Sequence, residues 1–410
     1  MAHIKSEGTT RANGSLINAT FLMVKGFIGT GVLFLAHSFT NAGLISSLVL
    51  LVVMASFSLW GMWLLFKASL VIPGSYQDIV GELYGAGFKR MVMLSLAFCQ
   101  YGFVMVYFLF VASNVSDLIS TMTDCTYQIK EWAILISVQL IVYVPLVLIR
   151  NIQNLAKFAA LANVLMLSGI IFVIINSIIK INSGKAEIKL FNNISDTSLF
   201  LGTAIFTYEG FGLVVPISQS MKNPSKFGTV LTSTIIIVSI LYILIGTLGY
   251  SAYGIDTETV ILLNMPNNWQ LKAIQFGYVI AVMLSMPLQF FPAIEILESP
   301  FFTNLNPNEV FRSAYRIFLT ICAAFGAYLG AKSLDVFVSF IGAFCGMPVS
   351  FIYPPMIYLR SCAKSPFERW SCYFLLLFGV LVTVFASGIA FQKLLYGEYD
   401  QQIDRCATIV

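Results

Sequence analysis

Residues Phe200 to Pro224 read FLGTAIFTYEGFGLVVPISQSMKNP. The stretch 199–216 is long enough to cross a bilayer core, which takes roughly 20 mostly apolar residues. Yet Glu209 lies at its centre, followed by Gly210 and Gly212. A carboxylate at that depth is costly unless it faces a cavity or a partner, and glycines weaken a helix where its backbone binds a ligand. We therefore interpret this segment as a functional membrane helix; the alternative is a kinked helix with a protonated, packed glutamate.

The composition indicates an integral membrane protein. The chain is 58% hydrophobic and 10% charged, with a mean hydropathy of +0.86, whereas soluble domains carry about 25% charged residues. The net charge of +4 is too small to indicate nucleic acid binding. Seven cysteines without a CxxC spacing, together with two histidines, predict no metal site. No catalytic motif or cofactor fingerprint is visible, so we expect neither an enzyme nor a bound cofactor.

Apolar runs divide the chain into eleven expected transmembrane helices. They cover residues 16–36, 44–66, 91–119, 132–149, 157–179, 199–217, 229–250, 271–293, 312–331, 335–358 and 370–391. The longest polar connections are 180–198 and 254–270. The sequence thus predicts an all-α membrane domain at 16–391, between a short N-terminal tail (1–15) and a C-terminal tail (392–410).

Lysines and arginines predict the orientation of the chain. With a cytoplasmic N-terminus, 14 of the 23 basic residues fall in cytoplasmic segments and 8 on the other side, and Lys25 lies inside the first run. The segment Asn193-Ile194-Ser195, a glycosylation acceptor, falls on the non-cytoplasmic side. An odd number of spans places the C-terminal tail in a lumen or outside the cell.

Glycines interrupt two runs at matching places. The first run has helix breaks predicted at Gly29 and Gly31, and the sixth at Gly210 and Gly212. Such pairs point to a transporter site between inverted repeats, here 16–179 and 199–358, with 370–391 as an additional helix. Half-helix N-termini attract a carboxylate and free carbonyls attract an ammonium group, so two adjacent breaks suit a free amino acid. The alternative is that these glycines only allow close helix packing.

Four segments carry a resemblance to a known family. They read KGFIGTGVLFL (25–35, followed by NAG at 41–43), TAIFTYEGFGLVVPISQSMKNP (203–224), SMPLQFFPAIEILE (285–298) and SLDVFVSFIGAFCGMPVSFIYPP (333–355). The chain resembles the amino acid/auxin permease family of the amino acid-polyamine-organocation superfamily. It is most similar to its fungal vacuolar amino acid exporters, and similar also to animal proton-coupled amino acid transporters.

This resemblance implies an eleven-helix fold of the LeuT type, which is a 5+5 inverted repeat with one extra C-terminal helix. It also implies transport of neutral amino acids with protons, from the lumen of a vacuole or lysosome to the cytosol. The expected partners are therefore a free amino acid, protons and the lipid bilayer. Plasma-membrane import, sodium coupling and a sensor that does not transport remain alternatives. Sodium would need oxygens such as those of Thr30 and Ser285.

The resemblance also assigns roles to single residues. It implies that the substrate carboxylate binds at Gly29, Thr30 and Gly31, and that Phe206, Thr207 and Tyr208 face its amino group and side chain. Glu209 is the expected proton carrier, because a carboxyl group in a medium of low dielectric constant takes up a proton more readily than in water. The aromatic side chains expected to line the site favour small or medium neutral substrates over charged ones. The remaining expected substrate contacts are Phe27, Gly210 and Ser285, and the possible accessory residues are Lys25, Gln289 and Tyr101.

The chain departs from the family pattern in three places. Ala36 and His37 stand where relatives have a proline after the first-helix LFL, and we expect His37 to be solvated near the end of its span. Leu22 replaces the histidine of the animal proton-coupled branch, which leaves coupling to Glu209. The long polar N-terminal region of many fungal relatives is absent, so regulation through such a region is not expected.

Overall fold

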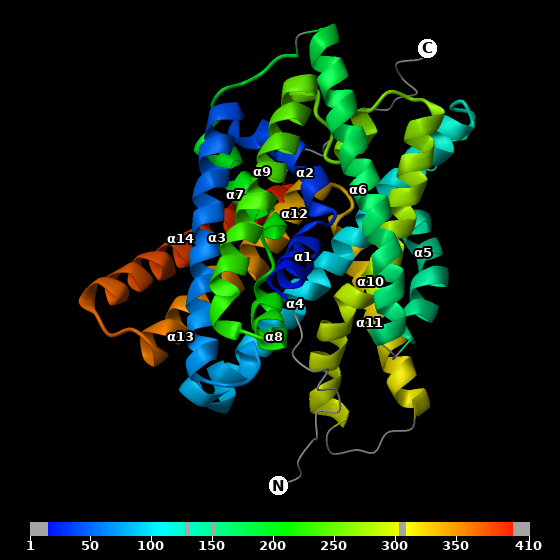
Figure 1. Ribbon diagram of the computed structural model, residues 1–410. Helices are drawn as coiled ribbons and strands as arrows, with labels where there is room; N and C mark the ends of the chain where they lie inside the picture. The colour runs from blue at the N-terminus through cyan, green and yellow to red at the C-terminus, as the bar shows by residue number, and fades with distance from the viewer. Residues whose placement is uncertain are drawn as a thin grey trace.

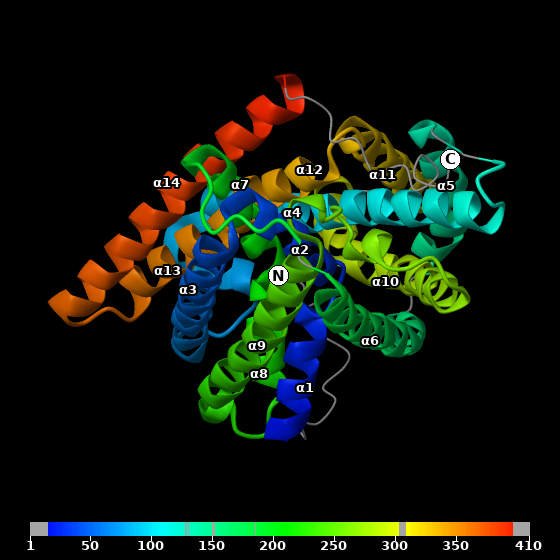
Figure 2. The same cartoon turned by 90° about the horizontal axis from the view of Figure 1, so that it is seen from above.

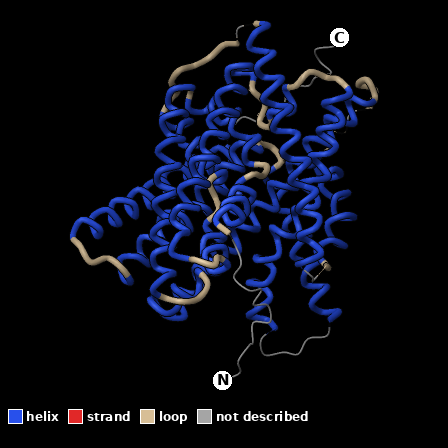
Figure 3. Tube along the Cα trace, viewed as in Figure 1, coloured by secondary structure: helices blue, strands red, loops and turns tan. Residues whose placement is uncertain are grey.

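The computed structural model describes residues 15–396, apart from residues 128, 130, 150–151, 185 and 303–308. In this part the chain folds into helices joined by mostly short loops, and no strand is present (Figure 3). The first half forms α1 (Leu16–Phe27), α2 (Gly31–Ala42), α3 (Leu44–Val71), α4 (Tyr76–Met122), α5 (Trp132–Val147) and α6 (Ile152–Ser183).

The second half begins with another pair of short helices. It consists of α7 (Ile194–Thr207), α8 (Phe211–Ser220), η1 (Pro224–Lys226), α9 (Phe227–Tyr253), η2 (Gly254–Asp256), η3 (Ile261–Asn264), α10 (Trp269–Phe302), α11 (Glu309–Gly330), α12 (Leu334–Ile341), η4 (Gly342–Gly346), η5 (Pro348–Ile352), α13 (Tyr353–Ser361) and α14 (Pro366–Tyr396). Each of the eleven predicted apolar runs falls on one of these helices or on a chain of consecutive ones.

The described residues contain nine helical stretches that are long and apolar enough to cross a membrane, and α1 with α2 makes a tenth. The axis bends by 55° between α1 and α2. With 16 residues, α5 is apolar but shorter than a typical span. The prediction of a multi-pass all-α membrane protein is therefore confirmed, and the total of eleven spans stays a prediction.

The outer surface of the bundle is apolar. Ile141 of α5, Val164 of α6 and Val384 of α14 have exposed fractions of 74%, 65% and 69%. Water would disfavour so much exposed apolar surface, whereas lipid tails accept it. Figure 2 shows α14 at one edge of the bundle and α5 with α6 at the opposite edge. These helices present their apolar faces to lipid.

The interior of the bundle contains α2 and α7, one helix of each short pair. Helix α2 packs along α7 and α9, and α1 packs on α9, while α10 runs along α4 and α6. In both views α2 lies near the centre of the bundle (Figures 1 and 2). Most residues of α2 and α7 are buried. The residues between these short helices are therefore enclosed by the longer ones.

Glycines allow α7 to approach the segment after α12 very closely. A Cβ atom on Gly342 would overlap the carbonyl oxygen of Gly202, and one on Gly202 would overlap that of Ser339. Small residues permit such contacts between membrane helices. The chain from α12 to α13 continues through the π-helical segments η4 and η5. The run 335–358 was predicted as one helix, and its π-helical part is a feature that hydropathy does not reveal.

The segment 254–268 between α9 and α10 differs from its sequence-based description as a polar connection. Val260, Ile261 and Leu262 are fully buried, and Ile261 lies near Ala36 of α2 beside Gly249. The five charged or amide side chains of the segment masked this short apolar stretch in the sequence. This loop is thus a packed part of the bundle that covers one end of α2.

Candidate functional site

The break between α1 and α2 consists of residues 28–30. Gly29 lies within it, as predicted from the sequence, whereas Gly31 is the first residue of α2. Thr30 is the N-cap of α2 but makes no side-chain capping bond. The first N–H groups of α2 therefore have no side-chain acceptor from their own cap, which is the arrangement that favours an anionic ligand.

The second break, at residues 208–210, separates α7 from α8. Gly210 is the N-cap of α8, again without a side-chain capping bond. The Phe27 ring lies over Gly210, where a Cβ atom would come within 2.5 Å of the ring. The prediction of a break at Gly212 is wrong, because Gly212 is helical within α8. A glycine lowers helix stability by only about 1 kcal/mol, which surrounding packing offsets.

The two breaks touch each other. The Thr207 hydroxyl donates to the Thr203 carbonyl at 2.8 Å and lies 3.5 Å from the carbonyl oxygen of Gly31. A Cβ atom on Gly31 would stand 3.3 Å from the Thr207 Cα atom. The absence of a side chain at Gly31 therefore allows α2 and α7 to approach each other closely. The structure thus brings together the segments that the sequence singled out from two distant regions of the chain.

Tyr242 of α9 joins the two breaks, and the sequence analysis did not identify it. Its hydroxyl lies 2.8 Å from the Phe27 carbonyl oxygen and 2.9 Å from that of Thr207, and its side chain is fully buried. Tyr278 of α10 places its hydroxyl 3.4 Å from the Gly29 carbonyl oxygen. Converging carbonyls at helix breaks attract a cation. Here a phenol O–H occupies the point where the Phe27 and Thr207 carbonyls converge.

Glu209 lies inside the second break, as predicted. Its Oε1 atom is shielded from solvent and has no hydrogen-bond partner among the described residues. The carboxylate is close enough to interact electrostatically with Tyr76, Cys99 and Tyr107 of α4. Buried polar atoms without a partner are rare in proteins, and each needs an explanation. A proton on this carboxyl group, or a hydrogen bond from a polar group of a ligand, would explain the unpaired oxygen.

Aromatic side chains surround the breaks. The Phe206 ring lies 4.4 Å from that of Phe103 and 6.2 Å from that of Phe34, measured between centroids. Tyr208 packs its ring 5.1 Å from that of Tyr242 and donates its hydroxyl to Ser239 at 2.8 Å. The Tyr208 hydroxyl therefore points at α9, so this side chain contributes its ring rather than a free polar group.

Of four other predicted residues, three make their hydrogen bonds away from the breaks. The Ser285 hydroxyl donates to the Ala281 carbonyl of its own helix at 2.8 Å. Gln289 is hydrogen-bonded to Gln100, and the Tyr101 hydroxyl donates to the Leu319 carbonyl at 2.6 Å. These bonds tie α10 and α11 to α4. Half-buried Lys25 lies in the last turn of α1, without a hydrogen bond or ion pair to any described residue.

The described residues contain no group of three or more His, Cys, Asp or Glu side chains arranged to hold a metal ion. What the site offers is uncapped helix N-termini, backbone carbonyls, aromatic rings and one carboxyl group. These groups suit a small molecule with both a negative and a positive end.

Comparisons with known proteins agree with this geometry. Residues 12–394 match the family described as transmembrane amino acid transporter protein. The chain is 37% identical over 387 residues to vacuolar amino acid transporter 3 of Schizosaccharomyces pombe, covering 93% of this chain and 59% of that protein. It is 35% identical over 401 residues to vacuolar amino acid transporter 4 of Saccharomyces cerevisiae, covering 90% and 56%. The chain thus spans less than three fifths of the length of these relatives.

A solved structure shares the fold. The crystal structure of MhsT in complex with L-phenylalanine superposes with a TM-score of 0.58, covering 92% of this chain and 99% of that one. The two sequences are 11% identical, so the likeness concerns the fold alone. It agrees with the expectation of a LeuT-type arrangement and leaves the division into two repeats of five as a prediction.

Proposed function

Since this chain belongs to the transmembrane amino acid transporter family, we propose that it carries neutral amino acids across a membrane together with protons. The relatives named above are vacuolar amino acid transporters, which supports a vacuolar or lysosomal membrane. Flow from lumen to cytosol, following the proton gradient, is part of the proposal. Membership in a transporter family also agrees with the expectation that the chain is not an enzyme. Transport proceeds by alternating access around the two helix breaks.

The substrate site lies where the two breaks meet. The first turns of α2 and α8 present N–H groups without a side-chain cap, and the helix dipole adds positive charge there. Helices α3, α9 and α12 also begin without a side-chain cap, so what distinguishes α2 and α8 is that both begin at the breaks. Uncapped N-termini in the interior bind the substrate carboxylate at Gly29, Thr30 and Gly31. The rings of Phe27, Phe206 and Tyr208 enclose its side chain.

Proton coupling rests on one observation, which is the unpaired Oε1 atom of Glu209 within the second break. A charged carboxylate without a partner is strongly disfavoured in a water-poor interior. Protonation removes that charge, so the enclosed state of the transporter carries the proton. Opening toward water on either side lets the carboxyl group lose it. Substrate and proton therefore cross in the same step.

Tyr242 favours protons over sodium at the breaks. Its hydroxyl fills the point at which the Phe27 and Thr207 carbonyls converge, and these are the ligands that a sodium ion would use there. The hydroxyl of Ser285, the other expected sodium ligand, is bonded to its own helix. These contacts leave the carboxyl group of Glu209 as the ion-binding group of the site.

The membrane topology follows the same proposal. Spans 1–5 correspond to α1–α2, α3, α4, α5 and α6, and spans 6–10 to α7–α8, α9, α10, α11 and α12–α13, with α14 as the eleventh. Cys125, between α4 and α5, is disulfide-bonded. Disulfides persist in oxidising compartments, and the predicted orientation places this loop on the non-cytoplasmic side. The cytoplasmic N-terminus thus agrees with the chemistry of Cys125.

Flux into proteoliposomes with an imposed pH gradient tests the proposal. We expect wild type to move neutral amino acids with the gradient, and Glu209→Gln to lose gradient-driven accumulation. Glu295→Gln is the matched control, because Glu295 is an exposed carboxylate of α10. Gradient-driven flux that survives in Glu209→Gln would place the coupling proton elsewhere.

Two further outcomes address the alternatives. Accumulation that follows a sodium gradient at constant pH would support sodium coupling instead. Amino acid binding without flux of any substrate, in well-folded wild type, would support a sensor. Localisation of the tagged protein in cells separates a vacuolar from a plasma-membrane transporter.

A further inference from the structure

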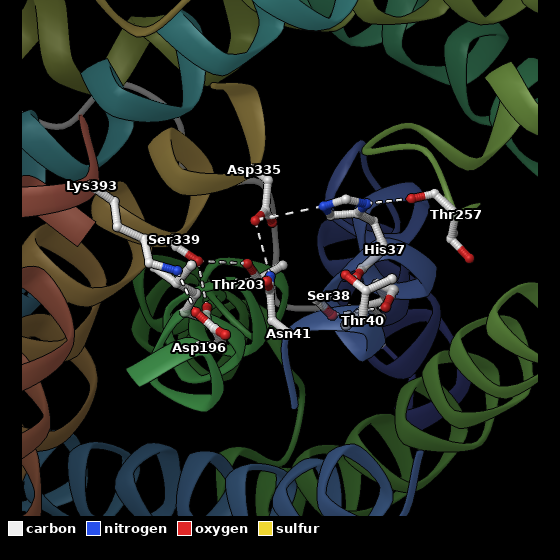
Figure 4. Close-up of polar contacts among 12 residues, drawn as sticks. His37, Ser38, Thr40, Asn41, Asp196, Thr203, Thr257, Asp335, Ser339 and Lys393 are labelled. Carbon is white, nitrogen blue, oxygen red and sulfur yellow. Dashed lines mark hydrogen bonds and ion pairs between the residues drawn. The ribbon is translucent and has the colours of Figure 1, made fainter. Parts of the chain in front are cut away.

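A second polar cluster lies away from the breaks, around His37 of α2 (Figure 4). The His37 Nδ1 atom is 2.5 Å from the Thr257 carbonyl oxygen, and its Nε2 atom is 3.7 Å from Asp335 Oδ2. Asn41 donates to the same carboxylate oxygen at 3.0 Å. The side chains of His37 and Asp335 are only 12% and 7% exposed. The expectation of a solvated histidine at the end of its span is therefore wrong.

The Thr257 carbonyl determines which ring nitrogen of His37 holds a proton. A carbonyl oxygen can only accept a hydrogen bond, so Nδ1 must donate. In the neutral ring the proton is then on Nδ1, and Nε2 presents a lone pair to the Asp335 carboxylate, which is also an acceptor. Only the doubly protonated, positively charged ring places an N–H on the side of Asp335. The contact between His37 and Asp335 thus changes from unfavourable to attractive when one proton binds.

We propose that His37 and Asp335 form a second proton-binding site, in which a bound proton fastens α2 to α12. The ligand is a proton from the compartment that this end of the bundle faces. In the predicted orientation this is the non-cytoplasmic compartment, since the C-terminal end of α2 points there. Proton binding stands on the geometry of the cluster alone, whereas the fastening role rests on the proposed transport function.

Few charged groups surround this site. Helices α9 and α3 pack on α2, but α9 carries no charged residue and the only one in α3, Lys67, is near its other end. The remaining charged residues come from the loops and from α7, α12 and α14: Glu187, Lys189, Asp196, Asp256, Glu258, Lys332, Asp335 and Lys393. Among these, Asp335 faces the ring of His37, while Asp196 is paired with Lys393 (Figure 4).

The cluster holds together the elements that would have to separate for this end to open. Thr257 belongs to the loop 254–268 that packs on α2, so His37 links that loop to α12. Nearby, Asp196 of α7 pairs with Lys393 of α14, and Thr203 of α7 lies 3.0 Å from Ser339 of α12, measured between hydroxyl oxygens. Separation of α2 from α12 would break the contact that the proton creates. A proton at His37 therefore favours closure of this end.

Histidine-selective NMR tests the site directly, because the chain has two histidines. The full chain with His3→Gln, purified without a histidine tag in lipid nanodiscs, leaves His37 as the only labelled imidazole. We expect the Nδ1–H tautomer at high pH and one titration between about pH 5 and 8. In Asp335→Asn the midpoint should fall by about one pH unit or more, a tenfold weaker affinity for the proton.

A matched control and two contrary outcomes complete this test. Asp256→Asn removes an exposed carboxylate one residue from Thr257 and should leave the midpoint nearly unchanged. An Nε2–H tautomer in wild type at high pH would overturn the proposal, and this readout needs no variant of Asp335. An equal midpoint in wild type and Asp335→Asn would overturn it as well.

The fastening role is tested separately in proteoliposomes. We expect His37→Gln to flatten the dependence of amino acid exchange on the pH of the non-cytoplasmic side, while net flux still follows the gradient through Glu209. An unchanged pH dependence in His37→Gln would refute fastening. Absence of any flux in wild type would refute the transport proposal, whereas proton binding at His37 would still be decided by the NMR titration.

Discussion

Replacing Tyr242 with phenylalanine removes one hydroxyl from the point where the two helix breaks are joined. The hydroxyl serves the carbonyl oxygens of Phe27 and Thr207, and the side chain is fully buried. A buried acceptor that loses its donor costs about 1–3 kcal/mol. Because the single hydroxyl proton bonds one carbonyl at a time, we expect Tyr242→Phe to lower the free energy of unfolding by about that amount.

The chain provides a matched control in Tyr143. It is also a fully buried tyrosine, but its hydroxyl has no hydrogen-bond partner among the described residues. The Tyr143 hydroxyl is buried without a hydrogen bond, so removing it relieves a desolvation penalty and leaves no acceptor without its donor. Tyr143→Phe should therefore be neutral or slightly stabilising. The two variants make the same chemical change at equal burial. The difference in stability between the two variants therefore reports the contribution of the bonds to the Phe27 and Thr207 carbonyls.

Thermal melting of both variants in nanodiscs measures this difference. Unfolding entropy of roughly 2.1 cal/mol/K per residue gives about 0.9 kcal/mol/K for the whole chain, so 1–3 kcal/mol corresponds to about 1–4 °C. We expect Tyr242→Phe to melt about 1–4 °C below wild type, with Tyr143→Phe at or above wild type. A Tyr143→Phe midpoint as low as that of Tyr242→Phe would contradict a stabilising role of the bonds to the Phe27 and Thr207 carbonyls. So would a wild-type midpoint for Tyr242→Phe.

Two further pairs of variants give clear expectations. Gly210→Ala should reduce uptake at least about tenfold, because its Cβ would lie 2.5 Å from the Phe27 ring and a shift of about 1 Å at a site can cost that much or more. Gly212→Ala should keep wild-type uptake, because a Cβ atom there would have no neighbour within 4 Å. Equal losses of uptake in the two variants would contradict this. Arg316→Met should lower stability by about 3–5 kcal/mol by leaving Glu298 without its 2.7 Å partner. The double variant that also changes Glu298 to Met should recover most of that loss in a thermal melt, and no recovery would show that the pair acts through packing instead.

Hydropathy was sufficient to locate the apolar helices because each predicted span is an apolar run between polar residues. It did not predict the first part of α4, since the run 91–119 leaves out residues 76–90. Glu209 and Gly210 were also predictable, since a carboxylate and a glycine within such a run are visible in the sequence itself. The length of α5 shows the limit of this method. Its run 132–149 reads as a span, yet its 16 helical residues are too few to settle the number of spans by length.

Residues whose role depends on contacts between distant segments were not predictable. Gly210 and Gly212 are alike in sequence, and only the position of the Phe27 ring distinguishes them. Tyr242 and Tyr143 are both tyrosines in apolar helices, and only the packing of α9 on the breaks gives one of them partners. The Ser285 hydroxyl donates to a carbonyl of its own helix, a contact that the sequence does not reveal, and its role at the site stays a prediction.

The most direct test of proton coupling through the helix breaks is the movement of protons driven by an amino acid gradient. Proteoliposomes with a pH-sensitive dye inside, equal pH on both sides and potassium with valinomycin to clamp the voltage would receive a neutral amino acid outside. We expect acidification of the interior with wild type, and none with Glu209→Gln. Amino acid uptake by wild type without any change of internal pH would contradict proton coupling.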